Sequence, residues 1–178
     1  MLEQDQKLVQ DAQQDPEKFG LLYDKYFDQI YRYVYRRVND KETVQDLVSQ
    51  SFYDALAHIK SFEWRGYPFS SWLYKIAHNN VLKWYREQSK GHKVNLDDIG
   101  ELADLTVDQV RDASRKEKQL EVQMVIDQLD AEEREIIRLK FFEEVSNIEI
   151  AEIMGLSANH IGVKVYRTLK KVKQLLKS

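Results

Sequence analysis

The segment from Ser146 to Lys173 constrains the fold most, because it reads as two short helices joined by one tight turn. Ser146 and Glu149 have the S-x-x-E spacing of a capping box, which predicts a helix that starts at Ser146. Gly155 is free to take the positive φ that a sharp turn needs, and Ser157 can cap the helix that follows. These local signals predict a helix-turn-helix.

The second helix of this pair has features of a DNA reader. Ala151, Gly155 and Ile161 have the spacing of helix-turn-helix proteins, whose second helix enters the major groove. From His160 to the C-terminus the chain has six Lys or Arg residues and no Asp or Glu. Capped helix pairs with a glycine turn also occur as plain packing units. Cations near the C-terminal end stabilise any helix, so the basic residues alone do not indicate DNA binding. The combination of cap, turn and basic helix favours DNA binding.

Charge is distributed unevenly along the chain, although the net charge is only −3. Residues 61–93 have six basic and two acidic side chains, whereas residues 94–135 have five basic and thirteen acidic ones. The C-terminal 43 residues, 136–178, are basic again, with eight basic and four acidic side chains. Two basic blocks on either side of an acidic one predict two separate contacts with nucleic acid.

Hydrophobic periodicity predicts an all-α protein of two small domains. Apolar residues recur at helical spacing within residues 19–34, 44–59 and 69–81, and we find no convincing strand. We expect a helical domain over residues 1–88, an acidic, flexible linker over 89–114, and a helix-turn-helix domain over 115–178. The chain has no Cys, no signal peptide and no apolar run that could insert in a membrane, so we expect a cytoplasmic protein.

A second candidate site is the segment that holds all three tryptophans, between residues 64 and 84. Aromatic side chains interleaved with cations are typical of single-strand binding, in which bases stack and phosphates are held. The same pattern also fits a helix with an aromatic core face. We expect Trp72 and Phe69 in the core, and Trp64 and Tyr67 exposed in a loop around Gly66.

Four segments in this order resemble the bacterial sigma-70 family, in its two-domain extracytoplasmic-function type. They cover nearly the whole chain: residues 15–38 (DPEKFGLLYDKYFDQIYRYVYRRV), 46–62 (DLVSQSFYDALAHIKSF), 69–87 (FSSWLYKIAHNNVLKWYRE) and 129–157 (LDAEEREIIRLKFFEEVSNIEIAEIMGLS). The resemblance implies a factor that binds core RNA polymerase through the clamp of its largest subunit, recognises promoter DNA and helps open it. It also implies an anti-sigma factor as a partner.

The resemblance assigns residues to three surfaces. The polymerase-binding surface would include Asp46, Leu47, Ser49, Gln50 and Tyr53. Single-stranded DNA of the minus-10 element would meet Trp64, Arg65, Lys75, His78, Asn79, Lys83 and Arg86. The minus-35 element would meet the recognition helix at Ser157, Asn159, His160, Lys164, Arg167 and Lys170.

Two positions depart from the family pattern. Gln50 stands where the family usually has an acid, which removes one charge from the implied polymerase surface. Gly162 stands where the recognition helix usually has Lys, and glycine inside a helix costs about 1 kcal/mol relative to Ala. Asn159 could pair with an adenine edge, whereas His160 could equally be an exposed residue with no role.

Other functions remain as alternatives. A stand-alone helix-turn-helix regulator would bind duplex DNA unaided, but it leaves the aromatic and basic segment unexplained. An enzyme is disfavoured, because the sequence has no metal-ligand spacing, no Gly-rich phosphate loop and four scattered histidines. We therefore expect neither a cofactor nor a metal.

Overall fold

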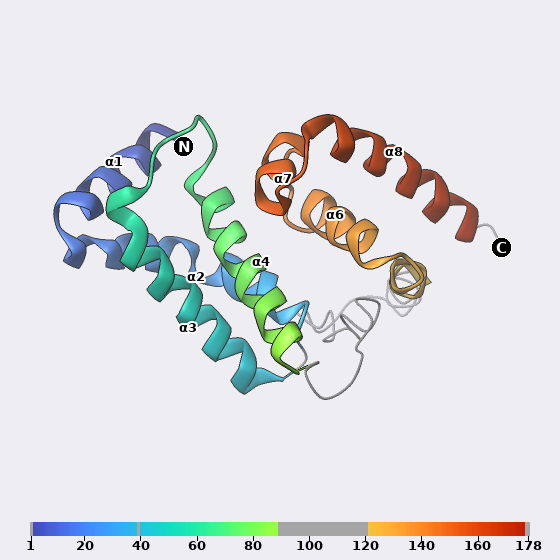
Figure 1. The fold of residues 1–178 in the computed structure, drawn as a ribbon, viewed down its shortest axis with the longest axis horizontal. Helices are drawn as coiled ribbons and strands as arrows, with labels where there is room; N and C mark the ends of the chain where they lie inside the picture. Colours follow the sequence, from blue (N-terminus) through green and yellow to red (C-terminus); the bar gives the residue numbers. More distant parts are fainter. Residues whose placement is uncertain (1, 39, 89–120, 177–178) are drawn as a thin grey trace, which may run out of the picture.

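The chain folds into helices joined by short loops in the part that the structure describes, which is residues 2–38, 40–88 and 121–176 of a computed structural model (Figure 1). These residues contain no strand, so the all-α prediction is confirmed. The expected acidic linker over residues 89–114 lies outside the described residues, and the exact domain limits stay a prediction. The helices are α1 (Leu2–Gln14), α2 (Phe19–Tyr35), α3 (Lys41–His58), α4 (Phe69–Gln88), a helix over 121–127, α6 (Ala131–Phe141), α7 (Asn147–Met154) and α8 (Ala158–Leu175).

The N-terminal half is a bundle of α1 to α4 around an aromatic and aliphatic core. Asp40 caps α3, because its side chain accepts a hydrogen bond of 2.8 Å from the backbone N–H of Thr43. Helix α4 buries one face at helical spacing, as the sequence predicts. That face consists of Phe69, Leu73, Tyr74, Ala77 and Val81.

The C-terminal half contains the predicted helix-turn-helix. A capping box of Ser146 and Glu149 starts α7, so this predicted cap is confirmed. A second capping box, of Asp130 and Glu133, starts α6. Gly155 ends α7 in the left-handed region, with φ of +69°, and thereby makes the turn. The backbone N–H of His160 donates to the Ser157 hydroxyl, which caps α8.

The two halves pack against each other along α4 and α7, which lie side by side near the centre of the molecule (Figure 1). Apolar residues of both halves belong to one continuous core cluster, with Phe69 and Leu73 on one side and Ile150 and Ile153 on the other. Helix α8 packs on α6 and α7, on the side of the C-terminal half that faces away from the bundle. The fold therefore buries one face of the helix-turn-helix and leaves its second helix on the outside.

Candidate nucleic-acid interface

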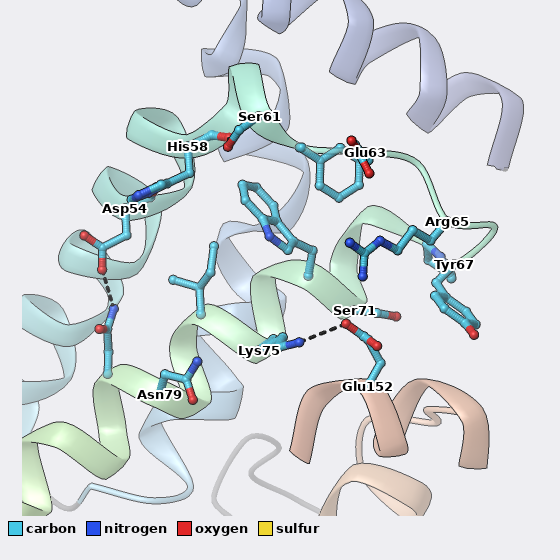
Figure 2. Close-up of a pocket in the computed structure, with 15 residues that line it drawn as sticks. Asp54, His58, Ser61, Glu63, Arg65, Tyr67, Ser71, Lys75, Asn79 and Glu152 are labelled. Atoms are coloured by element: carbon cyan, nitrogen blue, oxygen red, sulfur yellow. Dashed lines mark hydrogen bonds and ion pairs between the residues drawn. The ribbon is translucent and has the colours of Figure 1, made fainter. Parts of the chain in front are cut away.

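A pocket of about 740 Å³ opens between α3, α4 and the loop that joins them, and α7 closes one side (Figure 2). The loop contributes Arg65 and Tyr67, and α4 contributes Trp72, Lys75 and Asn79. Its wall thus combines aromatic rings, cations and amides, which are the groups that hold bases and phosphates of a single strand. The remaining lining residues include Asp54, His58, Ser71, Asn80 and Glu152.

The structure brings three of the seven predicted minus-10 residues to this pocket, namely Arg65, Lys75 and Asn79. Lys83 and Arg86 are exposed further along α4, beyond the pocket. His78 is largely buried beside α2, where its Nδ1 lies 3.2 Å from the Tyr33 hydroxyl. The seventh, Trp64, does not line the pocket either.

The two tryptophans at this end of α4 are both half-buried, so neither has the place that we expected for it. Trp64 is half-buried and packs edge-on against Phe62, with ring centroids 6.1 Å apart, so the expectation of an exposed Trp64 is wrong. Trp72 is half-buried and lines the pocket, whereas Phe69 is buried as expected. Helical spacing places Trp72 beside Phe69 but cannot show that its outer edge borders a hollow.

The pocket is charged on both sides. The Nζ of Lys75 donates to a Glu152 carboxylate oxygen at 2.8 Å, so a carboxylate of α7 faces the cations of the pocket (Figure 2). The hydrogen bond from Lys75, aided by the charge of Arg65, lowers the pKa of Glu152 below its ordinary value. At the opposite wall, the Asn80 amide donates to Asp54 at 3.0 Å and holds α4 against α3.

The outward face of α3 carries the residues predicted to meet the polymerase. Asp46, Ser49, Gln50 and Tyr53 are exposed and share this face, and Tyr53 is 67% exposed. Leu47 is buried in the core, so its expected place at the surface is corrected to a packing role beneath the helix. The remaining four form a continuous polar and aromatic surface.

The recognition helix presents an open face. Five of the six residues predicted to meet the minus-35 element are exposed, and Lys164 is half-buried. The exposed five are the N-cap Ser157 and, on α8, Asn159, His160, Arg167 and Lys170. Two exposed residues that the sequence reasoning missed, Val163 and Tyr166, lie among them. Helical spacing could have indicated both residues. Val163 follows Asn159 by one turn, and Tyr166 lies between Lys164 and Arg167. Gly162 has no atom within 4 Å of where a Cβ would stand, so packing within the chain does not require glycine there.

One acidic residue of α6, Glu132, holds two of the basic side chains of α8. Glu132 accepts from His160 at 3.1 Å and pairs with Lys164 at 3.0 Å. These hydrogen bonds lower the pKa of the Glu132 carboxyl. All three groups are partly exposed, so water and nucleic acid can reach them.

Comparison with known protein families shows which family this chain belongs to. Residues 22–91 match the family described as Sigma-70 region 2, and residues 119–172 match Sigma-70, region 4. RNA polymerase sigma factor YlaC of Bacillus subtilis is 32% identical over 155 residues, which cover 86% of this chain and 88% of YlaC. The chain belongs to the sigma-70 family, and is of the extracytoplasmic-function type.

This sigma factor also resembles longer relatives and solved structures. ECF RNA polymerase sigma factor BldN of Streptomyces coelicolor is 32% identical over 174 residues, which cover 96% of this chain but only 65% of BldN. The sigma factor RpoE of Bartonella quintana, solved in complex with the anti-sigma factor NepR, has the same fold. The two chains align with a TM-score of 0.69 at 20% sequence identity. The alignment covers 90% of this chain and 98% of the RpoE chain. Family membership favours the sigma-factor interpretation over a stand-alone regulator.

Within residues 2–38, 40–88 and 121–176, no three His, Cys, Asp or Glu side chains gather as a metal site would require. In the same part of this sigma factor, no helix is both long enough and apolar enough to cross a membrane.

Proposed function

We propose that this chain binds core RNA polymerase and directs it to promoters, reading the minus-10 element with residues 1–88 and the minus-35 element with residues 115–178. It acts in the cytoplasm as a non-enzymatic subunit that positions DNA for the polymerase. The observation that supports the proposal is that one sigma-70 chain carries two separate surfaces with accessible cations, amides and aromatic rings. One is the pocket beside α4, and the other is the open face of α8.

In the pocket, we propose that a base leaves the melted strand and stacks on Trp72 or Tyr67. A stacked base is worth about 1–3 kcal/mol and does not require a particular sequence. Arg65 and Lys75 would hold the flanking phosphates, and the exposed amide of Asn79 would meet a base edge. Lys83 and Arg86 would contact phosphates further along the strand, while Trp64 would support the loop from below.

On α8, we propose that Asn159 and His160 approach base edges, because they lie at the N-terminal end of the recognition helix. Arg167 and Lys170, about two and three turns further on, would contact the phosphates beside the groove. Tyr166, which is 71% exposed, adds an aromatic edge on this face that could pack against a thymine methyl or a sugar.

The outward face of α3 is the proposed docking surface for the polymerase clamp, through Asp46, Ser49, Gln50 and Tyr53. An exposed tyrosine surrounded by polar groups is a typical anchor of a protein interface. We also propose an anti-sigma factor as a partner. A structure with this fold was solved with such a protein bound, although that likeness is one of fold alone.

Transcription in vitro tests the proposal most directly. The chain is mixed with core polymerase and a promoter library, and the transcripts are sequenced to find their start sites. We expect defined start sites with a shared upstream pattern. If no defined starts appear, and the chain alone protects a palindromic duplex from nuclease, the stand-alone regulator is the correct interpretation.

Two variants separate the proposed surfaces. Arg65→Ala is expected to slow promoter opening without weakening core polymerase binding, and Tyr53→Ala is expected to weaken core binding. Arg32→Ala is a matched control, since Arg32 is exposed on α2 outside the pocket and the α3 face. Permanganate footprinting measures opening, and fluorescence anisotropy measures core binding. Equal loss of both properties in Arg65→Ala would contradict the proposed pocket.

A further inference from the structure

Helix α1 lies before the residues that match Sigma-70 region 2, which begin at position 22. It packs against α2 and α4, and against a short 3-10 helix, Ile59–Ser61, that follows α3 (Figure 1). From this 3-10 helix the chain runs through residues 63–68, the loop that contributes Arg65 and Tyr67 to the pocket. The proposed function assigns no residue of α1 to DNA or polymerase, yet α1 contacts the segment from which this loop starts.

The side chain of Gln13 joins α1 to the start of the loop. Its amide nitrogen, Nε2, donates to the carbonyl of Ile59 at 3.0 Å and to the carbonyl of Phe62 at 2.8 Å. These two carbonyls lie at opposite ends of one turn, which the Phe62 N–H closes by donating to the Ile59 carbonyl at 3.1 Å. Because a primary amide has two N–H donors, one side chain connects both ends of the turn to α1.

Helix α1 is itself anchored to α2, which gives Gln13 a fixed place. The Asp5 side chain is only 2% exposed and forms an ion pair with Lys25. The Tyr26 hydroxyl forms a hydrogen bond with the same carboxylate. Ala12, the neighbour of Gln13 on α1, is fully buried in the core. Buried contacts near both ends of α1 therefore fix the position from which Gln13 donates.

Phe62, whose carbonyl accepts from Gln13, lies at the centre of the aromatic cluster beside the pocket. The centroid of its ring lies 4.9 Å from that of Trp72, 5.4 Å from that of Phe69 and 6.1 Å from that of Trp64. Aromatic pairs at these distances favour particular relative orientations of their rings. Phe62 and Trp72 both line the pocket, and Trp72 is one of the two rings on which we propose that a base stacks. A shift of the Phe62 backbone would therefore move the stacking surface.

The loop after Phe62 is short, so the position of its first residue affects where its cation lies. Residues 63–68 join Phe62 to Phe69, which is fully buried at the start of α4. Within this loop Gly66 takes a φ of +80°, a left-handed conformation that other residues rarely adopt. Arg65 directly precedes Gly66 and lines the pocket. A backbone that is fixed at both ends therefore presents Arg65 to the pocket, and loss of the contact at Phe62 would free one end.

We propose that Gln13 is a positioning residue for promoter opening, which holds the loop of residues 63–68 and the Trp72 ring in the arrangement that receives a base and its phosphate. Gln13 itself lies outside the pocket and acts through the backbone of Phe62. The inference rests on the proposed function for the use of the pocket, whereas the effect of Gln13 on the loop does not depend on it. Helix α1 thus contributes to promoter opening without touching DNA.

Fluorine NMR of the chain labelled with 5-fluorotryptophan tests whether Gln13 positions the loop. The chain has three tryptophans, so three resonances are expected, and single Trp→Phe variants assign them. Trp64 and Trp72 pack on Phe62, whereas Trp84 packs on Tyr85 towards the other end of α4. Gln13→Met keeps the length of the side chain and removes both donors. We expect the resonances of Trp64 and Trp72 to shift or broaden, and that of Trp84 to stay in place.

Gln14→Met is the matched control, because Gln14 is the exposed neighbour of Gln13 on α1, and it should move no resonance. If the resonances of Trp64 and Trp72 stay in place in Gln13→Met as well, the proposal is overturned. Far-ultraviolet circular dichroism checks that Gln13→Met is folded. If it is not, Gln13→Lys and Gln13→Glu decide, because only the first offers N–H donors to the two carbonyls. We expect Gln13→Lys to preserve both resonances and Gln13→Glu to shift them, and equal effects overturn the proposal.

Opening of promoter DNA by the complex of this chain with core polymerase tests the role of Gln13 in function. The probes are the promoters that transcription in vitro identifies, with permanganate footprinting for opening and anisotropy for core binding. We expect Gln13→Met to slow opening about tenfold with core binding unchanged, because each lost hydrogen bond lowers the population of the correctly placed loop several-fold. If Arg65→Ala slows opening and Gln13→Met does not, the positioning role is overturned. If neither slows opening although the fluorine resonances move, the proposed use of the pocket is wrong, and with it the role of Gln13 in opening.

Discussion

Helices α4 and α8 are both long and basic, and both carry proposed DNA contacts, but they find their carboxylate partners in different places. Lys75 of α4 pairs with Glu152 from the other half of the molecule. Lys164 and His160 of α8 pair with Glu132 of their own half. The availability of α4 therefore depends on how the two halves are arranged, whereas that of α8 does not. Of the two proposed DNA surfaces, only that of α4 therefore has a charged partner in the other half of the molecule.

Removal of the buried cation beside α4 should have the largest effect. The Arg37 guanidinium donates to both oxygens of Glu135, at 3.0 and 2.9 Å, and only 2% of its side chain is exposed. Arg37→Met leaves Glu135 buried without its partner, and we expect the free energy of unfolding to fall by about 3–5 kcal/mol. Lys164→Met on α8 breaks a partly exposed pair and should cost at most about 1 kcal/mol. Urea denaturation followed by circular dichroism measures both values.

A double variant provides the control for this prediction. R37M/E135M removes both charges, so it should recover most of the stability that Arg37→Met loses. If Arg37→Met costs no more than Lys164→Met, the pair is not buried in solution, and the contrast between the two helices disappears.

Loss of the cap of α8 should have the next largest effect on stability. Ser157→Ala removes the hydroxyl that accepts from the His160 N–H, and should lower the free energy of unfolding by about 1 kcal/mol. Fraying of this end should also weaken duplex binding, because Asn159 and His160 lie there. Ser157→Thr keeps a capping hydroxyl and serves as the control. Unchanged duplex binding despite the lower stability would contradict the proposed contact of this end of α8 with DNA.

Gly162 gives an effect of the opposite sign. Gly162→Ala should raise the free energy of unfolding by about 0.5–1 kcal/mol, because glycine in a helix is entropically costly and an added methyl group meets nothing. Thermal denaturation measures the gain. Duplex binding should be unchanged, and weaker binding despite higher stability would indicate that the DNA backbone approaches this position closely.

The smallest effect is expected at Glu132. Glu132→Gln releases Lys164 and His160 from a partly exposed carboxylate, an interaction worth about 0.2–1 kcal/mol. Duplex DNA should then bind more tightly, by up to about fivefold. Electrophoretic mobility shift measures the change, with Glu144→Gln as the control. Weaker binding would mean that Glu132 positions the two side chains for DNA rather than competing with it.

Local signals explain why the helix-turn-helix could be predicted from sequence in detail. Each cap joins residues three positions apart, and the turn needs only the freedom of Gly155, so no distant contact enters. The family resemblance was carried by similarly local motifs. The same reasoning failed for Trp64 and Trp72, because a helical period gives a face but not the path of the loop that passes over it.

The contact between the halves could not be predicted, because nothing in the sequence marks its members. Glu135 and Glu143 lie among other acids of a helix and its end, and by pattern they read as ordinary surface residues. Their partners, Arg37 and Arg36, are about a hundred residues away. Only the packing of α4 on α7 brings them together and buries them, and helix periodicity does not encode that packing.

The burial of Arg37 and Glu135 has a consequence for how the molecule responds to salt. Counter-ions screen exposed charges within about 8 Å at physiological ionic strength, but they reach a buried pair poorly. The pair of Lys75 and Glu152, with more than a third of each side chain exposed, would loosen as ionic strength rises, while the inner pair would persist. Fluctuations in the ionic strength around the protein would then leave the inner contact between the halves in place.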